Sequence, residues 1–321
     1  MKNWLRAAFL TILLFWPLTA FSSSEGPLQI KNQFPIFLHV NQPYLEKAGM
    51  ESSMSYSLSH SSTYTVQSSG TWDINLDMEI TELNFRYKRI YRDLFEIGLD
   101  IPVIYTGGGF MDGFLEGYHD TFGFNDYGRG ARPDNAFLYE VRKDGNLIVQ
   151  GDSGLGLGDI RLTLKRPIIT SDGLNLSIQG DIELPVGDAK KGFGNGSVDG
   201  GLSVLLDKRI SDKIMTYWNL GGVFAGDVKG HQTLDIDNFI YGGAAIEAHV
   251  NEKLSLLAQV MGQTPIYPKT DLLAVDRDSW ILALGGRYHT GKGSLELSLS
   301  EDINLSGAPD FILNLTYKMP L

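Results

Sequence analysis

Hydrophobic and polar residues alternate with a period of two along most of the chain after residue 50. One apolar series consists of Phe95, Ile97, Leu99, Ile101, Val103 and Tyr105. A second consists of Leu174, Leu176, Ile178, Ile182 and Leu184, with Asn175, Ser177, Gln179, Asp181 and Glu183 between them. Because successive side chains of a β-strand point to opposite faces, each series predicts a strand with one apolar and one polar face.

The alternation predicts about twelve strands, most of them long enough to cross a membrane. They are 50–62, 71–90, 94–106, 158–168, 173–185, 197–208, 213–226, 238–250, 253–265, 278–290, 292–301 and 310–319. A tilted transmembrane strand needs about 9–11 residues, whereas strands of soluble proteins are usually nearer 5–6. The predicted fold class is therefore all-β, an antiparallel transmembrane β-barrel of about 12 strands.

The connections between these segments alternate between short and long. The short ones are 91–93, 169–172, 209–212, 251–252 and 291, and the long ones are 63–70, 107–157, 186–196, 227–237, 266–277 and 302–309. Outer-membrane barrels have short periplasmic turns and longer extracellular loops. The pattern predicts an outer-membrane protein of a Gram-negative bacterium, with both mature termini in the periplasm.

The segment 71–90 changes the parity of its apolar residues. They are even-numbered from Trp72 to Ile80 and odd-numbered from Leu83 to Tyr87. A β-bulge near Thr81 and Glu82 would account for the change, so one long bent strand is predicted. The polar face of the predicted wall carries charges of both signs, which suit a wet or salt-bridged lumen better than a dry core. The lumen-facing candidates are Asp77, Glu79, Arg86, Arg161, Lys165, Asp181, Glu183 and Arg287.

The first residues have the pattern of a secretory signal peptide. Lys2 and Arg6 precede an apolar run at 7–15, and small residues surround a predicted cleavage site after Ser22. We therefore expect a signal peptide at 1–22, an N-terminal lead at 23–49 and the barrel at 50–321. The lead is rich in proline yet contains apolar residues, so we expect it to pack in or under the barrel.

Composition narrows the function classes. Without Lys2 and Arg6 the chain has 27 − 2 = 25 basic and 38 acidic residues, a net charge of −13, which disfavours nucleic-acid binding. The absence of cysteine excludes a disulfide scaffold, a cysteine metal site and a lipid anchor on cysteine. The mean hydropathy of −0.08 does not fit a protein with many membrane-spanning helices.

Two groups of residues resemble known families. The glycine- and aromatic-rich stretch 107–123, the residues 129–134 and the lead motifs Gly26-Pro27-Leu28 and Asn32-Gln33-Phe34-Pro35 resemble a proteobacterial outer-membrane family of unknown function. That resemblance covers most of the mature chain and implies fold and location. The stretch 184–188 resembles, more weakly, a strand-to-loop corner of putative transporter barrels linked to aromatic-compound degradation. Neither family implies catalytic residues.

The long extracellular loop 107–157 is expected to carry a short amphipathic helix, because Met111, Phe114, Leu115, Tyr118 and Phe122 recur at helical spacing. This helix would either act as a lid at the barrel mouth or stabilise its rim.

Two groups of polar residues, one in the loop and one on the wall, are candidates for a ligand-binding or catalytic site. Glu116, His119 and Asp120 fall on one face of the predicted helix, a spacing that can hold a ligand, but no further ligand cluster accompanies them. His60 and Ser62 share the outer face of the first strand. This His-x-Ser pair resembles that of outer-membrane phospholipases, except that Thr63 and Tyr64 follow where that family has Asn-Gly.

The main hypothesis is a channel or uptake pore for a small solute. The alternatives are a plugged structural or partner-binding barrel and a lipid-acting enzyme on the outer wall. A solvent path would favour the channel, a lumen filled by paired charges and the lead would favour the plugged barrel, and a third polar group beside His60 and Ser62 would be needed for the enzyme. We expect no enzyme activity, cofactor or metal. The expected partners are outer-membrane lipid, the barrel assembly machinery and a small-molecule solute.

Overall fold

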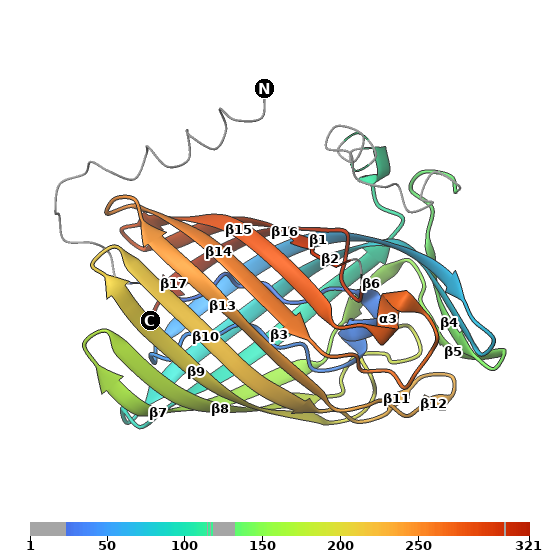
Figure 1. The fold of residues 1–321 in the computed structure, drawn as a ribbon, viewed down its shortest axis with the longest axis horizontal. Helices are drawn as coiled ribbons and strands as arrows, with labels where there is room; N and C mark the ends of the chain where they lie inside the picture. The colour runs from blue at the N-terminus through green and yellow to red at the C-terminus, as the bar shows by residue number, and fades with distance from the viewer. Residues whose placement is uncertain (1–23, 114, 116, 118–131, 305) are drawn as a thin grey trace.

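Twelve strands close into one antiparallel barrel in the computed structural model, which describes residues 24–321 except 114, 116, 118–131 and 305 (Figure 1). The barrel strands are β1 (Ser53–Ser68), β2 (Trp72–Tyr91), β3 (Phe95–Gly107), β7 (Ile160–Ser171), β8 (Leu174–Leu184), β9 (Asp199–Ser211), β10 (Ile214–Phe224), β13 (Phe239–His249), β14 (Leu254–Gln263), β15 (Ser279–Thr290), β16 (Gly293–Asp302) and β17 (Phe311–Pro320). β1 pairs with β17 from Ser53↔Pro320 to Ser62↔Phe311, which closes the ring. The predicted fold class is confirmed, and the signal peptide expected at 1–22 lies outside the described residues.

The barrel has one end with short turns and one with long connections, which we call the turn end and the loop end. Connections at the turn end are as short as the two residues between β7 and β8. Both the C-terminus and the start of β1 lie there, joined by a hydrogen bond from Leu321 N to Ser52 O of 2.9 Å. The alternation of connection lengths thus predicted the arrangement of the strands correctly.

The predicted β-bulge in β2 is wrong. The register between β1 and β2 runs without a shift from Ser53↔Lys88 to Ser68↔Asp73, and that between β2 and β3 is equally regular. The parity changes because the two faces exchange their chemistry along the strand. Inward-facing side chains are polar near Arg86 and apolar near Trp72, and both are buried.

The loop end extends beyond the twelve-stranded ring. Residues 63–68, expected in a loop, continue β1, because Tyr64, Thr65 and Val66 favour strand and pair with β2. β4 (Leu138–Lys143) and β5 (Asn146–Gln150) form a hairpin that continues the sheet from β2, and β6 (Gly154–Leu157) pairs with β3. Figure 1 shows this hairpin projecting past the ring, so part of the expected long loop is sheet.

Few helical residues occur in the described chain. They include the 3-10 helix η1 (Pro35–His39), the four-residue α3 (Leu273–Asp276) and the helical residues 112, 113, 115 and 117 inside the expected loop helix. No described helix is long and apolar enough to cross a membrane. A further two-stranded ribbon, β11 (Val228–Lys229) with β12 (Thr233–Leu234), lies at the loop end.

The N-terminal segment, residues 24–49, runs through the inside of the barrel (Figure 1). Phe34, Ile36 and Phe37 join an apolar cluster with Trp72 and Tyr267 at the loop end. Leu28, Ile30 and Leu45 pack in a second cluster against β14 and β15. The core of the protein therefore lies in the lumen, and much of it is supplied by this segment.

Candidate functional site: the filled lumen

The inner wall is lined by ion pairs between neighbouring strands. Arg86 Nε lies 2.6 Å from Asp100 Oδ1, and Arg161 Nη2 lies 3.3 Å from Asp181 Oδ2. Lys165 Nζ lies 2.9 Å from Glu96 Oε1. These side chains and the candidates Glu183 and Arg287 are buried inside the barrel. The wall thus neutralises much of its own charge.

Two of the predicted lumen-facing residues lie on the outer face of the barrel. Asp77 and Glu79 have the parity of Leu83 and Tyr87, which are exposed on the outer face, so the expectation that they line the lumen is wrong. Their assignment depended on the β-bulge, which would have inverted the parity. Both are nevertheless buried, because the long connection after β3 folds against them. Asp77 accepts a 2.6 Å hydrogen bond from Arg132 Nε, and Glu79 accepts one of 3.0 Å from Phe110 N.

The three loop candidates Glu116, His119 and Asp120 lie outside the described residues. The outer-wall pair can be located. His60 has one ring nitrogen 2.7 Å from Glu79 Oε2 and the other 2.8 Å from Thr81 Oγ1, and its ring stacks on Phe110. A third polar group is therefore present, but both ring nitrogens are engaged by groups other than the Ser62 hydroxyl.

The N-terminal segment begins at the turn end among polar side chains. The Glu25 carboxylate accepts a 2.6 Å hydrogen bond from Ser294 Oγ and lies 2.9 Å from His289 Nδ1. Arg287 Nη2 donates to the carbonyl oxygen of Gly26 at 2.9 Å, and Gly26 N donates to Tyr217 Oη at 3.2 Å. Side chains from three different strands therefore hold the first described residues.

Glu46 is the charged centre of the segment. Its carboxylate pairs with Arg86 Nη2 and lies 2.6 Å from Lys88 Nζ. Burial alone would raise the pKa of Glu46, but Arg86 and Lys88 hold it well below its ordinary value. The guanidinium of Arg86 also lies 4.3 Å from the centre of the Tyr44 ring. Glu46 and Tyr44 were not among the predicted site residues. The sequence feature that could have indicated Glu46 is a charged residue within a lead that was expected to pack in or under the barrel.

The end of the segment, residues 47–49, is held by side chains of β7 and β9. Asp207 accepts hydrogen bonds of 2.8 Å from Ala48 N and from Gly49 N. Lys165 Nζ donates to the Lys47 and Gly49 carbonyl oxygens at 2.9 and 3.2 Å. Wall side chains thus replace the backbone partners that an irregular chain lacks.

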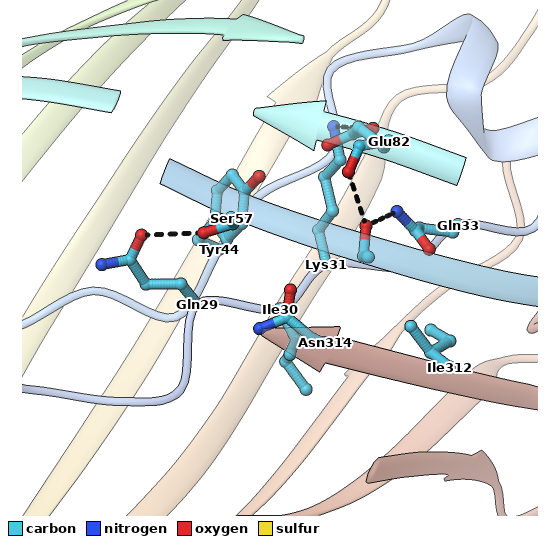
Figure 2. A pocket seen from close by; sticks show the side chains of 10 residues that line it. Gln29, Ile30, Lys31, Gln33, Tyr44, Ser57, Glu82, Ile312 and Asn314 are labelled. Atoms are coloured by element: carbon cyan, nitrogen blue, oxygen red, sulfur yellow. Dashed lines mark hydrogen bonds and ion pairs between the residues drawn. The ribbon is translucent and has the colours of Figure 1, made fainter. Parts of the chain in front are cut away.

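Little space remains beside the segment at mid-height. Lys31 Nζ lies 3.0 Å from Glu82 Oε2, and Gln33 Nε2 donates a hydrogen bond to Ser59 Oγ of β1. Figure 2 shows Lys31 extending toward Glu82. The cavity among these residues has a volume of about 10 Å³. That is about the minimum needed for one water molecule. At this level the lumen is closed by the segment.

Several buried polar groups of the segment and of the wall beside it have no protein partner. Within the described chain, both amide atoms of Gln42 and of Gln259 lack a hydrogen bond, as does Asn41 Oδ1. A buried polar group without a partner costs about 1–3 kcal/mol. Both the segment and the wall that faces it therefore contain buried polar atoms without a protein hydrogen bond.

Asp159 joins two connections at the loop end. It accepts hydrogen bonds from Gly187 N at 2.7 Å and from Asn195 N at 3.1 Å. Burial raises the pKa of Asp159 to about 6, although these two donors oppose the rise; nearby Asp199 adds to it. The charged form is therefore disfavoured in the folded protein.

Replacing Asp159 with Asn should change how stability depends on pH. A carboxyl whose pKa rises from 3.8 to about 6 on folding contributes most below pH 4, and that contribution is lost as the pH rises through 6. The full loss is about 3 kcal/mol. The stability of Asp159→Asn relative to wild type should increase by up to that amount between pH 4 and pH 7. Urea unfolding of the two proteins at several pH values measures it, and a constant difference would contradict the prediction.

The closed twelve-stranded antiparallel barrel with a polar, ion-paired inner wall is the architecture of outer-membrane-type barrels. The chain belongs to the DUF3187 family of proteins of unknown function, whose family model matches residues 5–320. The resemblance to a family of unknown function is thereby confirmed. No curated protein matches the chain in sequence.

Solved structures match the chain at low sequence identity. The COG4313 outer membrane channel from Pseudomonas putida F1 matches with a TM-score of 0.57 and 16% identity, covering 88% of this chain and 100% of that one. The NanC porin matches with a TM-score of 0.49 and 8% identity, over 84% and 100% of the two chains. The CymD monoaromatic hydrocarbon channel matches with a TM-score of 0.41 and 10% identity, over 85% and 90%.

Proposed function

We propose that the protein is an outer-membrane channel for a small polar solute, closed by residues 24–49 and opened when that segment withdraws. The observation that carries the proposal is that the wall retains most of its ion pairs without the segment. Several ion pairs within the wall do not involve the segment. They include Arg86 with Asp100, Arg161 with Asp181, and Lys165 with Glu96. Withdrawal would leave a hydrated lining in which these ion pairs remain.

The apolar outer face and the barrel fold support a location in the outer membrane. Large apolar side chains such as Leu164, Ile182, Leu284 and Leu297 are more than half exposed there. A closed barrel satisfies its backbone hydrogen bonds internally, which a lipid environment requires. The COG4313 outer membrane channel has the same fold. In this proposal the turn end, with both mature termini, faces the periplasm, and lipid surrounds the wall.

The filled lumen favours a second candidate, a plugged structural or partner-binding barrel. The apolar contacts of Phe34, Ile36 and Phe37 at the loop end anchor the segment in a way that wall charges do not. In that case the extracellular surface would be the functional part. The two candidates differ in whether the segment ever leaves the lumen.

Single-channel recording in a planar bilayer tests the proposal. We expect full-length protein that folds to a heat-modifiable form to give rare, brief conductance steps. Shortening the 107–157 connection should not enlarge them, because the segment still fills the lumen. Larger steps after shortening would assign the gate to that connection, and complete silence of the full-length protein would favour the plugged barrel.

A further inference from the structure

Two histidines face each other across one strand at the turn end of the lumen. His249 of β13 and His289 of β15 flank β14, and both are buried. His249 Nδ1 lies 2.8 Å from Ser255 Oγ, and His289 Nε2 lies 3.1 Å from the same atom. One nitrogen of each ring therefore points to a common position inside the barrel.

The other nitrogen of each ring is held by the N-terminal segment. His249 Nε2 lies 2.9 Å from Ser24 Oγ, and His289 Nδ1 lies 2.9 Å from Glu25 Oε1. Histidines that bind metals almost always use their second ring nitrogen in this way, with a carboxylate, carbonyl or water as partner. The outer contacts fix the rings so that the inner nitrogens converge.

A carboxylate completes the set. Glu247 lies two residues before His249 on the same inward face, and its oxygens and the histidine nitrogens can be chosen so that all three ligand atoms lie within 4.8 Å of one another. Two imidazoles and one carboxylate suit divalent transition metals such as Zn²⁺. Zn–N and Zn–O bonds are about 2.0–2.2 Å, so the ligand atoms of a tetrahedral ion lie about 3.3–3.5 Å apart, and binding would bring these atoms closer by up to about 1.5 Å.

The local charge and the access to the site are compatible with a cation. Glu247 and Glu296 share the guanidinium of Arg287, at 2.7 and 2.6 Å, so these three side chains carry a net negative charge. A cavity of about 300 Å³ at the turn end is lined by His289, Ser24 and Glu25. An ion could reach the histidines from that cavity.

We propose that His249, His289 and Glu247 bind one divalent transition-metal ion, with Zn²⁺ as the representative, in place of the Ser255 hydroxyl between the rings. The ion fixes both histidines, and these hold Ser24 and Glu25. Metal binding therefore strengthens the attachment of the N-terminal segment to the wall. The site is independent of whether the barrel conducts.

Isothermal titration of Zn²⁺ into the detergent-purified, untagged full chain tests the proposal. We expect one site per chain, weakened at least about 100-fold in His249→Ala/His289→Ala and about 10–100-fold in Glu25→Gln, which removes only a partner of a ligand. His231→Ala, at an exposed histidine, is the matched control and should bind as wild type does. No uptake by wild type, or equal uptake by the double variant and the control, overturns the proposal.

A second variant guards against misfolding of the double variant. Ser255→Ala removes the hydroxyl that competes with the ion, so its affinity for Zn²⁺ should equal or exceed that of wild type. If the histidines serve only a structural hydrogen-bond network, Ser255→Ala gains nothing and Zn²⁺ does not bind. Hydrogen exchange at residues 25–30 should also slow on adding Zn²⁺ to wild type but not to the double variant, and unchanged exchange in wild type contradicts the coupling to the segment.

Discussion

Deleting residues 24–49 should turn a nearly silent barrel into one that conducts in large, long-lived steps. The segment fills the lumen at mid-height, where the remaining cavity is about 10 Å³. Without it, the inner face consists mainly of polar and charged side chains that water can solvate. A barrel of this strand number is narrower than the 16–18-stranded porins, so the steps should be smaller than those of an open porin.

The measurement is single-channel recording of the deletion variant beside full-length protein. Both must first show the heat-dependent gel mobility of a folded barrel. Protein shortened within 107–157 is the matched control, because it loses chain at the loop end but keeps the segment. If the deletion variant folds and stays silent, the channel proposal fails and the plugged barrel becomes the better account.

Replacing Glu46 with Ala should destabilise the barrel by about 3–5 kcal/mol, the usual cost of leaving a buried charge without its partner. The Glu46 carboxylate is buried and pairs with both Arg86 and Lys88. Arg86 remains paired with Asp100, but among the described residues Lys88 remains paired only with the more distant Glu51, at 3.6 Å. The uncompensated charge therefore falls mainly on Lys88.

Urea unfolding of refolded protein, followed by loss of the heat-modifiable form, measures this change. Glu140→Ala is the matched control, because Glu140 pairs with Arg142 at 2.9 Å on a more exposed surface. Exposed pairs contribute about 0–1 kcal/mol. If Glu46→Ala lowers the free energy of unfolding as little as the control does, water readily replaces the Glu46 carboxylate beside Lys88. The segment would then be held mainly by its apolar contacts.

The barrel strands and the hairpin of β4 and β5 show which parts of the fold could be predicted from the sequence. All twelve barrel strands were predicted, because alternation is a local property of each strand. Their boundaries lie within about three residues of those observed, except that β1 ends at Ser68 and not at residue 62. The hairpin of β4 and β5 was missed although Asp144 and Gly145 form its turn, both with positive φ. Asp-Gly between apolar stretches is a strong hairpin signal. The stretch was treated as one loop because its flanking strands are short.

The error over Asp77 and Glu79 has a different cause. The sequence contains the parity change but not its reason, since a bulge and an exchange of chemistry between the two faces give the same pattern. Only the uninterrupted register between β1 and β2 distinguishes them. It puts both carboxylates on the outer face, where Phe110 and Arg132 supply partners.

The sequence by itself determined the strands, their order along the chain and which ends carry the short turns, because these depend on neighbouring residues. The tertiary structure alone decided which charges meet. Glu46 reaches Arg86 and Lys88 across the lumen, and His249 meets His289 because β14 lies between their strands. The alternation of polar and apolar residues predicts which side chains face inward, but it does not predict which residues they contact across the lumen. That depends on closure of the ring and on the path of residues 24–49 through it.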